Sequence, residues 1–233
     1  MKAIGIIGAM EIEIALLKER MDVISVKQVL GVDFYVGNMA GKNVIAARSR
    51  VGKVNAAICA QALIDLFGVD YVINTGVAGA LSEELNIGDV VISSELAHHD
   101  FDMTALGDAL GVNSSIAESF FKADEELIRL AKDACGEVLS PERTFVGRIA
   151  SGDVFIAEAE AKNRIKRAFN AMCVDMEGAA VAQTCFLNQL PFVVIRSISD
   201  KADGGANESF EKFVKEAANS SCSVTERVME NMA

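Results

Sequence analysis

Apolar runs and polar breaks alternate along the whole chain. Continuous apolar stretches over residues 3–7, 71–74 and 192–198 predict buried strands, and the last of them has the pattern of a central strand. Periodic or all-round apolar segments predict helices over residues 11–20, 52–67, 124–135, 158–169, 176–187 and from about 209 onward. Because strands and helices alternate without a linker, we expect a single three-layer α/β domain over residues 1–233.

The stretch between the first two helices predicts antiparallel hairpins. Val23–Val36 and Val44–Arg48 have strand composition and are interrupted by Gly31, Gly37 and Gly41. Connections this short favour a meander over crossovers, so the central β-sheet should be mixed and flanked by helices. Further strands are expected at residues 89–93, 143–150 and around 173.

Composition restricts the class of protein. Of 233 residues, 51% are hydrophobic but only 6% aromatic, which predicts a large aliphatic core. A net charge of −11 without any basic run argues against nucleic acid as a partner. No segment approaches the ~20 apolar residues of a membrane span, and the first apolar run breaks at Gly8, too early for a signal peptide. Five widely spaced cysteines without a CxxC favour reduced thiols, so we expect a cytoplasmic protein with no membrane partner.

Carboxylates follow three of the predicted strands. Glu13 comes after the first strand, Glu177 after the strand near residue 173, and Asp200 after the strand 192–198. A fourth strand is followed by the small residues Gly76–Gly79, which predict a turn. Each carboxylate has a structural interpretation in helix dipoles, caps or turns. Ligands of α/β sheets bind beyond the carboxyl ends of strands, so the convergence favours a pocket for a small uncharged molecule rich in hydroxyl groups.

Several common chemistries lack their motifs. No GxGxxG follows the first strand, Gly52-Lys53 lacks the context of a P-loop, and no GxSxG is present. His98 and His99 are the only histidines, and neighbours on a strand face opposite ways. Hydrogen bonding is therefore favoured over a shared metal ion, and neither metal nor cofactor is expected.

Six ordered motifs together carry a family resemblance. They are GIIGAMEIE at the start, SRVGKVNAA at 49–57, NTGVAGAL at 74–81, ASGDVFI at 150–156, VDMEGAAVA at 174–182 and RSISDKAD at 196–203. With them, essentially the whole chain resembles the bacterial 5′-methylthioadenosine/S-adenosylhomocysteine nucleosidases of the purine nucleoside phosphorylase superfamily. The resemblance implies a homodimeric enzyme of methionine salvage that hydrolyses the adenine–ribose bond of small adenine nucleosides without a metal or cofactor.

The resemblance also implies a role for each matching position. Asp200 corresponds to the general acid that protonates N7 of adenine, and Glu13 to the base that activates water, with Arg196 near that water. Glu177 corresponds to the ligand of the ribose hydroxyls, with Met176 against the sugar. The other positions form two groups, with Ala78, Gly79, Phe155, Ile156 and Ser199 around adenine and Met10, Val51, Met103, Leu106 and Phe210 around the 5′ substituent.

Two positions depart from the family pattern. Val77 replaces the Ser of some relatives, and Asp175 replaces a common Glu. Related phosphorylases bind phosphate with Arg and Ser at the positions of Asn74 and Val77, so this chain favours water as the nucleophile. Phosphorolysis, hydrolysis of aminodeoxyfutalosine or 5′-deoxyadenosine, and nucleoside binding without catalysis remain alternatives. The segment Gly107–Ser119 is our candidate for the loop with which a partner subunit closes the 5′ pocket.

Overall fold

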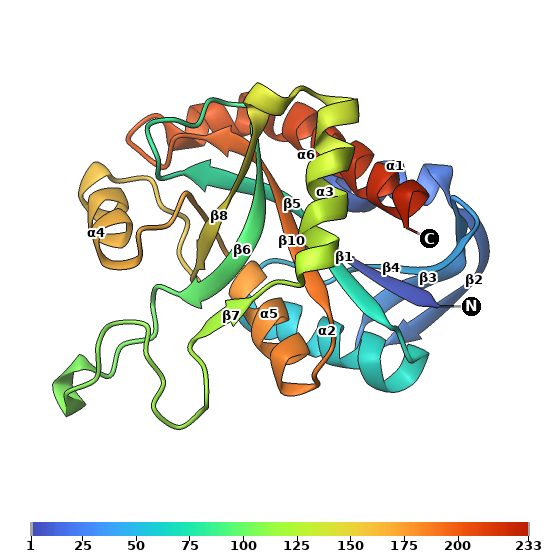
Figure 1. Ribbon diagram of the computed structural model, residues 1–233, viewed down its shortest axis with the longest axis horizontal. Helices are drawn as coiled ribbons and strands as arrows, with labels where there is room; N and C mark the ends of the chain where they lie inside the picture. Colours follow the sequence, from blue (N-terminus) through green and yellow to red (C-terminus); the bar gives the residue numbers. More distant parts are fainter. Residues whose placement is uncertain (1, 233) are drawn as a thin grey trace.

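The computed structural model describes residues 2–232 and has a ten-stranded β-sheet at its centre (Figure 1). The strands are β1 (Ala3–Gly8), β2 (Asp22–Val29), β3 (Val32–Met39), β4 (Lys42–Arg48), β5 (Tyr71–Ala80), β6 (Val90–His98), β7 (Phe120–Lys122), β8 (Thr144–Ser151), β9 (Cys173–Asp175) and β10 (Phe192–Asp200). β2, β3 and β4 pair antiparallel, which confirms the predicted meander. β1 pairs parallel with β4 and β5, so the sheet is mixed as expected.

Six α-helices pack against this sheet. They are α1 (Glu11–Arg20), α2 (Lys53–Phe67), α3 (Glu125–Val138), α4 (Ala159–Phe169), α5 (Gly178–Leu187) and α6 (Ala206–Asn231). α2 and α5 pack with Ile7 and Val194 in one apolar cluster, whereas α1, α3 and α6 pack with Ile6 and Ile195 in another. Neighbouring strand residues thus face opposite helix layers, as a period of two requires. The predicted three-layer α/β class is confirmed.

Five strands close one part of the sheet into a ring. β10 pairs with β5 on one side and β6 on the other, while β8 and β9 complete the path from β6 back to β5. In this ring Gly79 of β5 is paired with Asp200 of β10 and with Val174 of β9. The closure therefore brings together residues that are about a hundred positions apart in the chain.

Gly76–Gly79 lie within β5, so the predicted turn at these residues is wrong. The strand continues because β10 pairs with it as far as Gly79. These small residues provide room instead. A Cβ atom at Gly76 would lie 2.5 Å from Oε1 of Glu13, and one at Gly79 would lie 2.8 Å from Oδ1 of Asp200. Composition alone does not distinguish a glycine in a turn from a glycine that a buried side chain approaches.

Other predicted boundaries shift by a few residues. β6 and β10 extend beyond their predicted ends, α6 begins at Ala206 rather than near Ser209, and the short β7 was not predicted. Asp124, whose position before an amphipathic segment marks it as an N-cap, accepts a hydrogen bond of 2.9 Å from the Leu127 N–H. Within residues 2–232, no helix is long and apolar enough to cross a membrane.

Candidate active site

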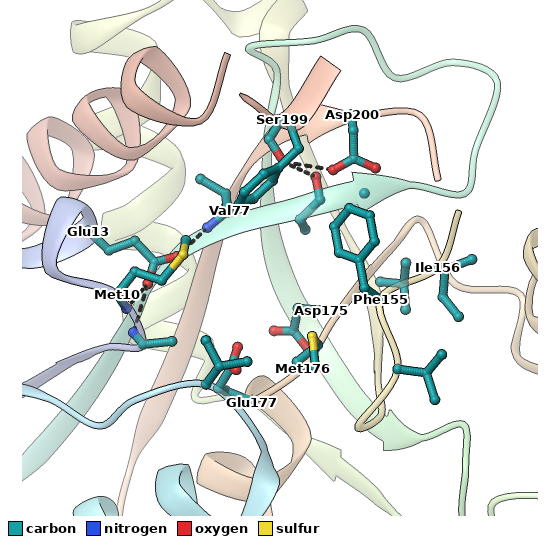
Figure 2. A pocket seen from close by; sticks show the side chains of 17 residues that line it. Met10, Glu13, Val77, Phe155, Ile156, Asp175, Met176, Glu177, Ser199 and Asp200 are labelled. Carbon is teal, nitrogen blue, oxygen red and sulfur yellow. Dashed lines mark hydrogen bonds between the residues drawn. The ribbon is translucent and has the colours of Figure 1, made fainter. Parts of the chain in front are cut away.

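A cavity of about 200 Å³ opens beside the ends of β1, β5, β9 and β10 (Figure 2). Four carboxylates face it, and most of the remaining wall is apolar. Its lining residues are Ala9, Met10, Glu13, Val51, Val77, Ala78, Gly79, Val154, Phe155, Ile156, Val174, Asp175, Met176, Glu177, Ser199, Asp200 and Phe210. None of these residues is Lys or Arg. The cavity therefore suits a ligand with apolar parts and without negative charge.

Three backbone N–H groups hold Glu13 in the first turn of α1. Its Oε2 accepts hydrogen bonds from Ala9 at 2.7 Å and Met10 at 2.8 Å, and its Oε1 accepts one from Val77 at 3.1 Å. Burial raises the pKa of Glu13, while the charge of Arg196 and the three N–H groups oppose that rise. Glu13 is thus an oriented carboxylate suited to accept a proton.

Asp200 lies at the other end of the cavity (Figure 2). Its Oδ2 is 2.8 Å from Ser199 Oγ, which donates to it, and its Oδ1 accepts a 2.9 Å hydrogen bond from the Ala202 N–H. Burial raises the pKa of Asp200 above the ordinary aspartate value, and these hydrogen bonds oppose the rise. A carboxyl group in this environment retains its proton to higher pH, as a general acid requires.

Arg196 lies behind the cavity wall rather than in it. Its guanidinium is buried, with Nε donating to Asp175 Oδ2 at 2.8 Å and Nη2 donating to Asn74 Oδ1 at 2.6 Å. The backbone oxygen of Asn74 accepts a further hydrogen bond from Nη1. Burial raises the pKa of both Glu13 and Glu177, and the Arg196 charge opposes that rise. Arg196 therefore acts on the cavity through its neighbours.

Glu177 precedes α5, but its side chain does not cap that helix. Its Oε1 accepts a 2.8 Å hydrogen bond from the N–H of Gly52, at the start of α2. Burial raises the pKa of Glu177, and the nearby Asp175 carboxylate raises it further. A carboxylate fixed in this way at a cavity wall can accept hydrogen bonds from ligand hydroxyl groups.

Two aromatic rings form an open side of the cavity. Phe155 and Phe210 meet edge to face with their ring centroids 5.7 Å apart. Phe155 is 43% exposed and Val51, also in the wall, is 47% exposed. Such a ring can stack on a planar base, and the open apolar side can take a substituent.

Comparisons with known proteins identify the family of this chain. A model of the phosphorylase superfamily matches residues 3–230. The 5′-methylthioadenosine/S-adenosylhomocysteine nucleosidase of Staphylococcus aureus (strain JH9) is 43% identical over 230 residues, which cover 98% of this chain and 100% of that protein. The chain belongs to the phosphorylase superfamily, among the 5′-methylthioadenosine/S-adenosylhomocysteine nucleosidases.

Solved structures of this superfamily are similar over their full length. The nucleosidase of Neisseria meningitidis, in complex with methylthio-immucillin-A, has a TM-score of 0.96 and 41% identity, with 100% of both chains covered. The native futalosine hydrolase of Helicobacter pylori strain 26695 has a TM-score of 0.93 and 35% identity, covering 99% of this chain and 98% of that one. The predicted fold and family are thereby confirmed.

Most positions expected from the nucleosidase resemblance line the cavity, but three do not. Arg196 lies behind the wall, because it is held there by Asp175 and Asn74. Met103 and Leu106 do not reach the cavity of their own chain, because the segment between β6 and β7 extends away from the sheet (Figure 1). Leu106 is 78% exposed there.

Sequence reasoning did not assign several residues that shape this nucleosidase cavity. Ala9 and Val77 contribute backbone N–H groups to Glu13, and a backbone donor carries no signature in residue type. Asp175 is the ion-pair partner of Arg196. The position of Asp175 at a strand end, two residues before Glu177, is a sequence signal that could have marked it as a residue of the cavity. Two further wall residues, Val154 and Val174, have only an apolar character that the core shares.

The two histidines lie outside the nucleosidase cavity. His98 Nε2 is 2.9 Å from Oε1 of Gln183, in keeping with the hydrogen-bonding role expected for it. Nε2 of His99 is buried without a hydrogen-bond partner among the described residues. Burial lowers the pKa of both His98 and His99 and so favours their neutral forms.

Proposed function

We propose that this chain hydrolyses the N-glycosidic bond of 5′-methylthioadenosine and S-adenosylhomocysteine, and also of 5′-deoxyadenosine, releasing adenine and the 5′-substituted ribose. The proposal rests on two carboxylates in one cavity. Glu13 contacts β5 at Val77, and Asp200 approaches the same strand at Gly79. Strand residues advance about 3.3 Å each, so the points on β5 that the two groups approach are roughly 7–10 Å apart. That separation leaves space for a sugar and a water between base and acid, as in inverting glycosidases.

Asp200 is the proposed general acid. Adenine leaves more readily as a neutral base than as an anion, so a proton delivered to N7 lowers the barrier to bond cleavage. Burial supports this role because it raises the pKa of Asp200. Phe155 would stack on adenine, and the backbone of Ile156 would contact its edge. Ala78, Gly79 and Ser199 would form the rest of the base site.

Glu13 is the proposed base that activates water. Two N–H groups occupy its Oε2 and one occupies its Oε1, which leaves Oε1 with capacity for a further donor such as water. Arg196 would orient Glu13 and this water from behind the cavity wall. Glu177 would hold the ribose hydroxyls, with Met176 against the sugar. Its negative charge would stabilise the oxocarbenium-like transition state.

The cavity favours water over phosphate as the nucleophile. No cation lines it, and Asn74 uses its side-chain oxygen for Arg196 and its amide nitrogen for the Ile7 carbonyl. Val77 offers only a backbone N–H, which Glu13 accepts. A phosphate anion would meet carboxylates in a wall that contains no Lys or Arg, and this opposes phosphorolysis.

Adenine release in phosphate-free buffer tests the proposal directly. The purified protein should release adenine from methylthioadenosine at the same rate with and without phosphate, and the other product should be a free sugar. Adenosine and inosine should react more slowly because they lack the apolar 5′ group or the exocyclic amine. Absence of release above the uncatalysed rate would overturn the proposal, and formation of a sugar 1-phosphate would assign phosphorolysis instead.

Aminodeoxyfutalosine is the second candidate substrate. Support comes from the similarity to the futalosine hydrolase of Helicobacter pylori. The two candidates share the base and the ribose and differ at the 5′ carbon, where Met10, Val51 and Phe210 form an apolar wall. We expect a higher kcat/KM for methylthioadenosine in a direct competition assay, and the reverse order would favour the second candidate.

A homodimer would complete the 5′ side of the cavity. The segment between β6 and β7 extends away from the sheet (Figure 1), although Leu110 and Ile116 within it pack against the core. It contains Met103, Leu106 and Gly107–Ser119, which a second copy could accept. Exposed apolar side chains on and near α2, including Val51, Val54 and Ile58, offer a surface for association. Light scattering should give twice the 24.8 kDa chain mass, and the monomer mass would contradict the dimer.

We place the reaction in methionine salvage and in the removal of S-adenosylmethionine products in the cytoplasm. The five cysteines are all free and buried, as in proteins of reducing compartments. Fractionation of cells that produce the protein would locate it, and recovery outside the cytoplasm would contradict this assignment.

A further inference from the structure

Lys162 is a buried cation that the proposed reaction does not use. It lies on α4 and is 7% exposed. Burying an ammonium group costs free energy unless partners compensate for the lost water. Among the described residues, the Glu83 carboxylate is the one that lies within 4 Å of Lys162 Nζ. It is 3.7 Å away, and the Glu83 side chain is 77% exposed. An exposed partner of this kind contributes little, so the position of Lys162 needs another explanation.

The hydrogen bond of Lys162 leads to the peptide group between Lys201 and Ala202. Nζ of Lys162 donates to the Lys201 carbonyl oxygen at 2.9 Å. The N–H of the same peptide unit donates to Oδ1 of Asp200 at 2.9 Å. Because a peptide unit is planar and polar, ammonium and carboxyl groups contact opposite ends of one dipole. A cation at the carbonyl polarises the unit and makes its N–H a stronger donor.

The backbone at this peptide group is held in a conformation that alanine rarely adopts. Ala202 is fully buried and has a φ of +50°, which an L-residue with a Cβ atom adopts only under constraint from its surroundings. Ile165 and Phe169 of α4 pack in the same apolar cluster as Ala202. α4 thus supplies both the packing around Ala202 and, through Lys162, the hydrogen bond that sets the direction of the peptide group.

We propose that Lys162 is a positioning residue for the general acid. Through the Lys201–Ala202 peptide group, it keeps Oδ1 of Asp200 as a hydrogen-bond acceptor, so that the acidic proton stays on Oδ2. The proposal rests on the proposed function of Asp200. Ser199 Oγ is 2.8 Å from Oδ2, and a hydroxyl group can rotate to accept from a protonated carboxyl as well as donate to an ionised one. Lys162 thus selects the oxygen that gives up the proton.

The charges around Asp200 give the direction of the expected change. The Lys162 ammonium on α4 lowers the pKa of Asp200, and Asp203, in the segment after β10, raises it. The Cys173 thiol on β9 also lies close enough to sense the Asp200 charge. Removal of the ammonium takes away one of the groups that oppose the rise in the Asp200 pKa and weakens the Ala202 N–H as a donor, so Asp200 becomes a weaker acid.

Lys162→Met tests the proposal, because methionine fills the buried stem and removes the charge. Lys166→Met is the matched control: Lys166 lies one turn further along α4 at the same 3.7 Å from Glu83, and no hydrogen bond joins it to Lys201. We expect Lys162→Met to lower kcat about tenfold or more and to leave KM little changed. A positioned general acid typically contributes 10²–10⁴-fold to the rate, and the variant should lose a part of that contribution. The basic limb of the kcat–pH profile should move to higher pH, and that of Lys166→Met should stay in place.

A titration independent of turnover separates this inference from the proposed function. ¹³C-carboxyl NMR of the aspartates, with the Asp200 signal assigned by its loss in Asp200→Asn, should show a higher Asp200 pKa in Lys162→Met than in the wild type. If Lys162→Met does not fold, Lys162→Gln keeps a polar group there and should give the same upward shift. An unchanged Asp200 pKa, or a lower kcat with an unmoved basic limb, would overturn the inference. Failure of the wild type to release adenine would overturn the proposed function alone.

Discussion

The carboxylate of Glu13 occupies the space that a side chain on Gly76 would need. A Cβ atom there would lie 2.5 Å from Oε1 of Glu13 and 3.3 Å from Nη1 of Arg196. β5 therefore presents bare backbone to both charged groups at this point. The position of the Glu13 carboxylate thus depends on a residue that has no side chain.

Gly76→Ala should displace Glu13 and sharply reduce turnover. We expect kcat to fall at least tenfold and the protein to lose about 1–3 kcal/mol of unfolding free energy through overpacking. Gly136→Ala on α3 is the control, because nothing lies within 4 Å of its Cβ position and alanine favours a helix. Steady-state kinetics and thermal unfolding measure both effects. Wild-type kcat in Gly76→Ala would show that Glu13 does not need this space.

Asp200→Asn and Glu13→Gln should each lose turnover while retaining ligand binding. Either substitution keeps the size of the side chain and removes one proton-transfer group, which typically contributes 10²–10⁴-fold to rate. Adenine release measures kcat, and calorimetry with a non-hydrolysable analogue measures binding. Turnover equal to that of the wild type in both variants would contradict the assignment of proton transfer to Asp200 and Glu13, and no turnover in any of the three proteins would support a nucleoside-binding protein without catalysis.

Glu177→Gln should stabilise the unliganded protein, and more so at higher pH. Burial raises the Glu177 pKa above its ordinary value of 4.5. A carboxyl group whose pKa is higher in the folded than in the unfolded protein does not reduce stability at a pH below its unfolded-state pKa. It reduces stability as the pH rises toward its folded-state pKa. Glutamine removes that loss and can still accept from Gly52. Thermal unfolding at pH 5 and pH 8 should give a larger gain at pH 8, on the order of 1 kcal/mol or more, and an equal gain at both would contradict the sign.

Asp153→Ala should loosen the loop that carries Phe155. Oδ1 of Asp153 accepts a 2.8 Å hydrogen bond from the Lys53 N–H at the start of α2, next to the Gly52 N–H that Glu177 accepts. Glu177 and the loop that carries Phe155 thus contact the same end of α2. We expect KM to rise several-fold with a smaller change in kcat, and stability to fall by about 1 kcal/mol, as for a lost helix cap.

Asp153→Asn is the control for this change, because its amide oxygen can still accept the hydrogen bond. It should remain near the wild type in both KM and thermal stability. Equal effects of Asn and Ala would show that charge, rather than the cap, accounts for the loss.

The sequence predicted most of the elements because their patterns are local. A buried strand needs an apolar run and an amphipathic helix needs a period near 3.6, and both are visible within ten to fifteen residues. Predictions were wrong or absent where pairing with a distant segment of the chain decides the local structure. Gly76–Gly79 belong to a strand because β10 pairs with them, and β7 exists because three residues pair with β6.

By itself, the sequence determined the α/β class, the family and the carboxylates at the strand ends, because residue identity and spacing are properties of the chain alone. Only the tertiary structure decided how those carboxylates are held. Glu13 is oriented by the Val77 N–H from another strand, and Asp200 is joined to Lys162 through a single peptide group. Backbone donors and close approaches depend on the register between distant segments, and no local pattern records that register.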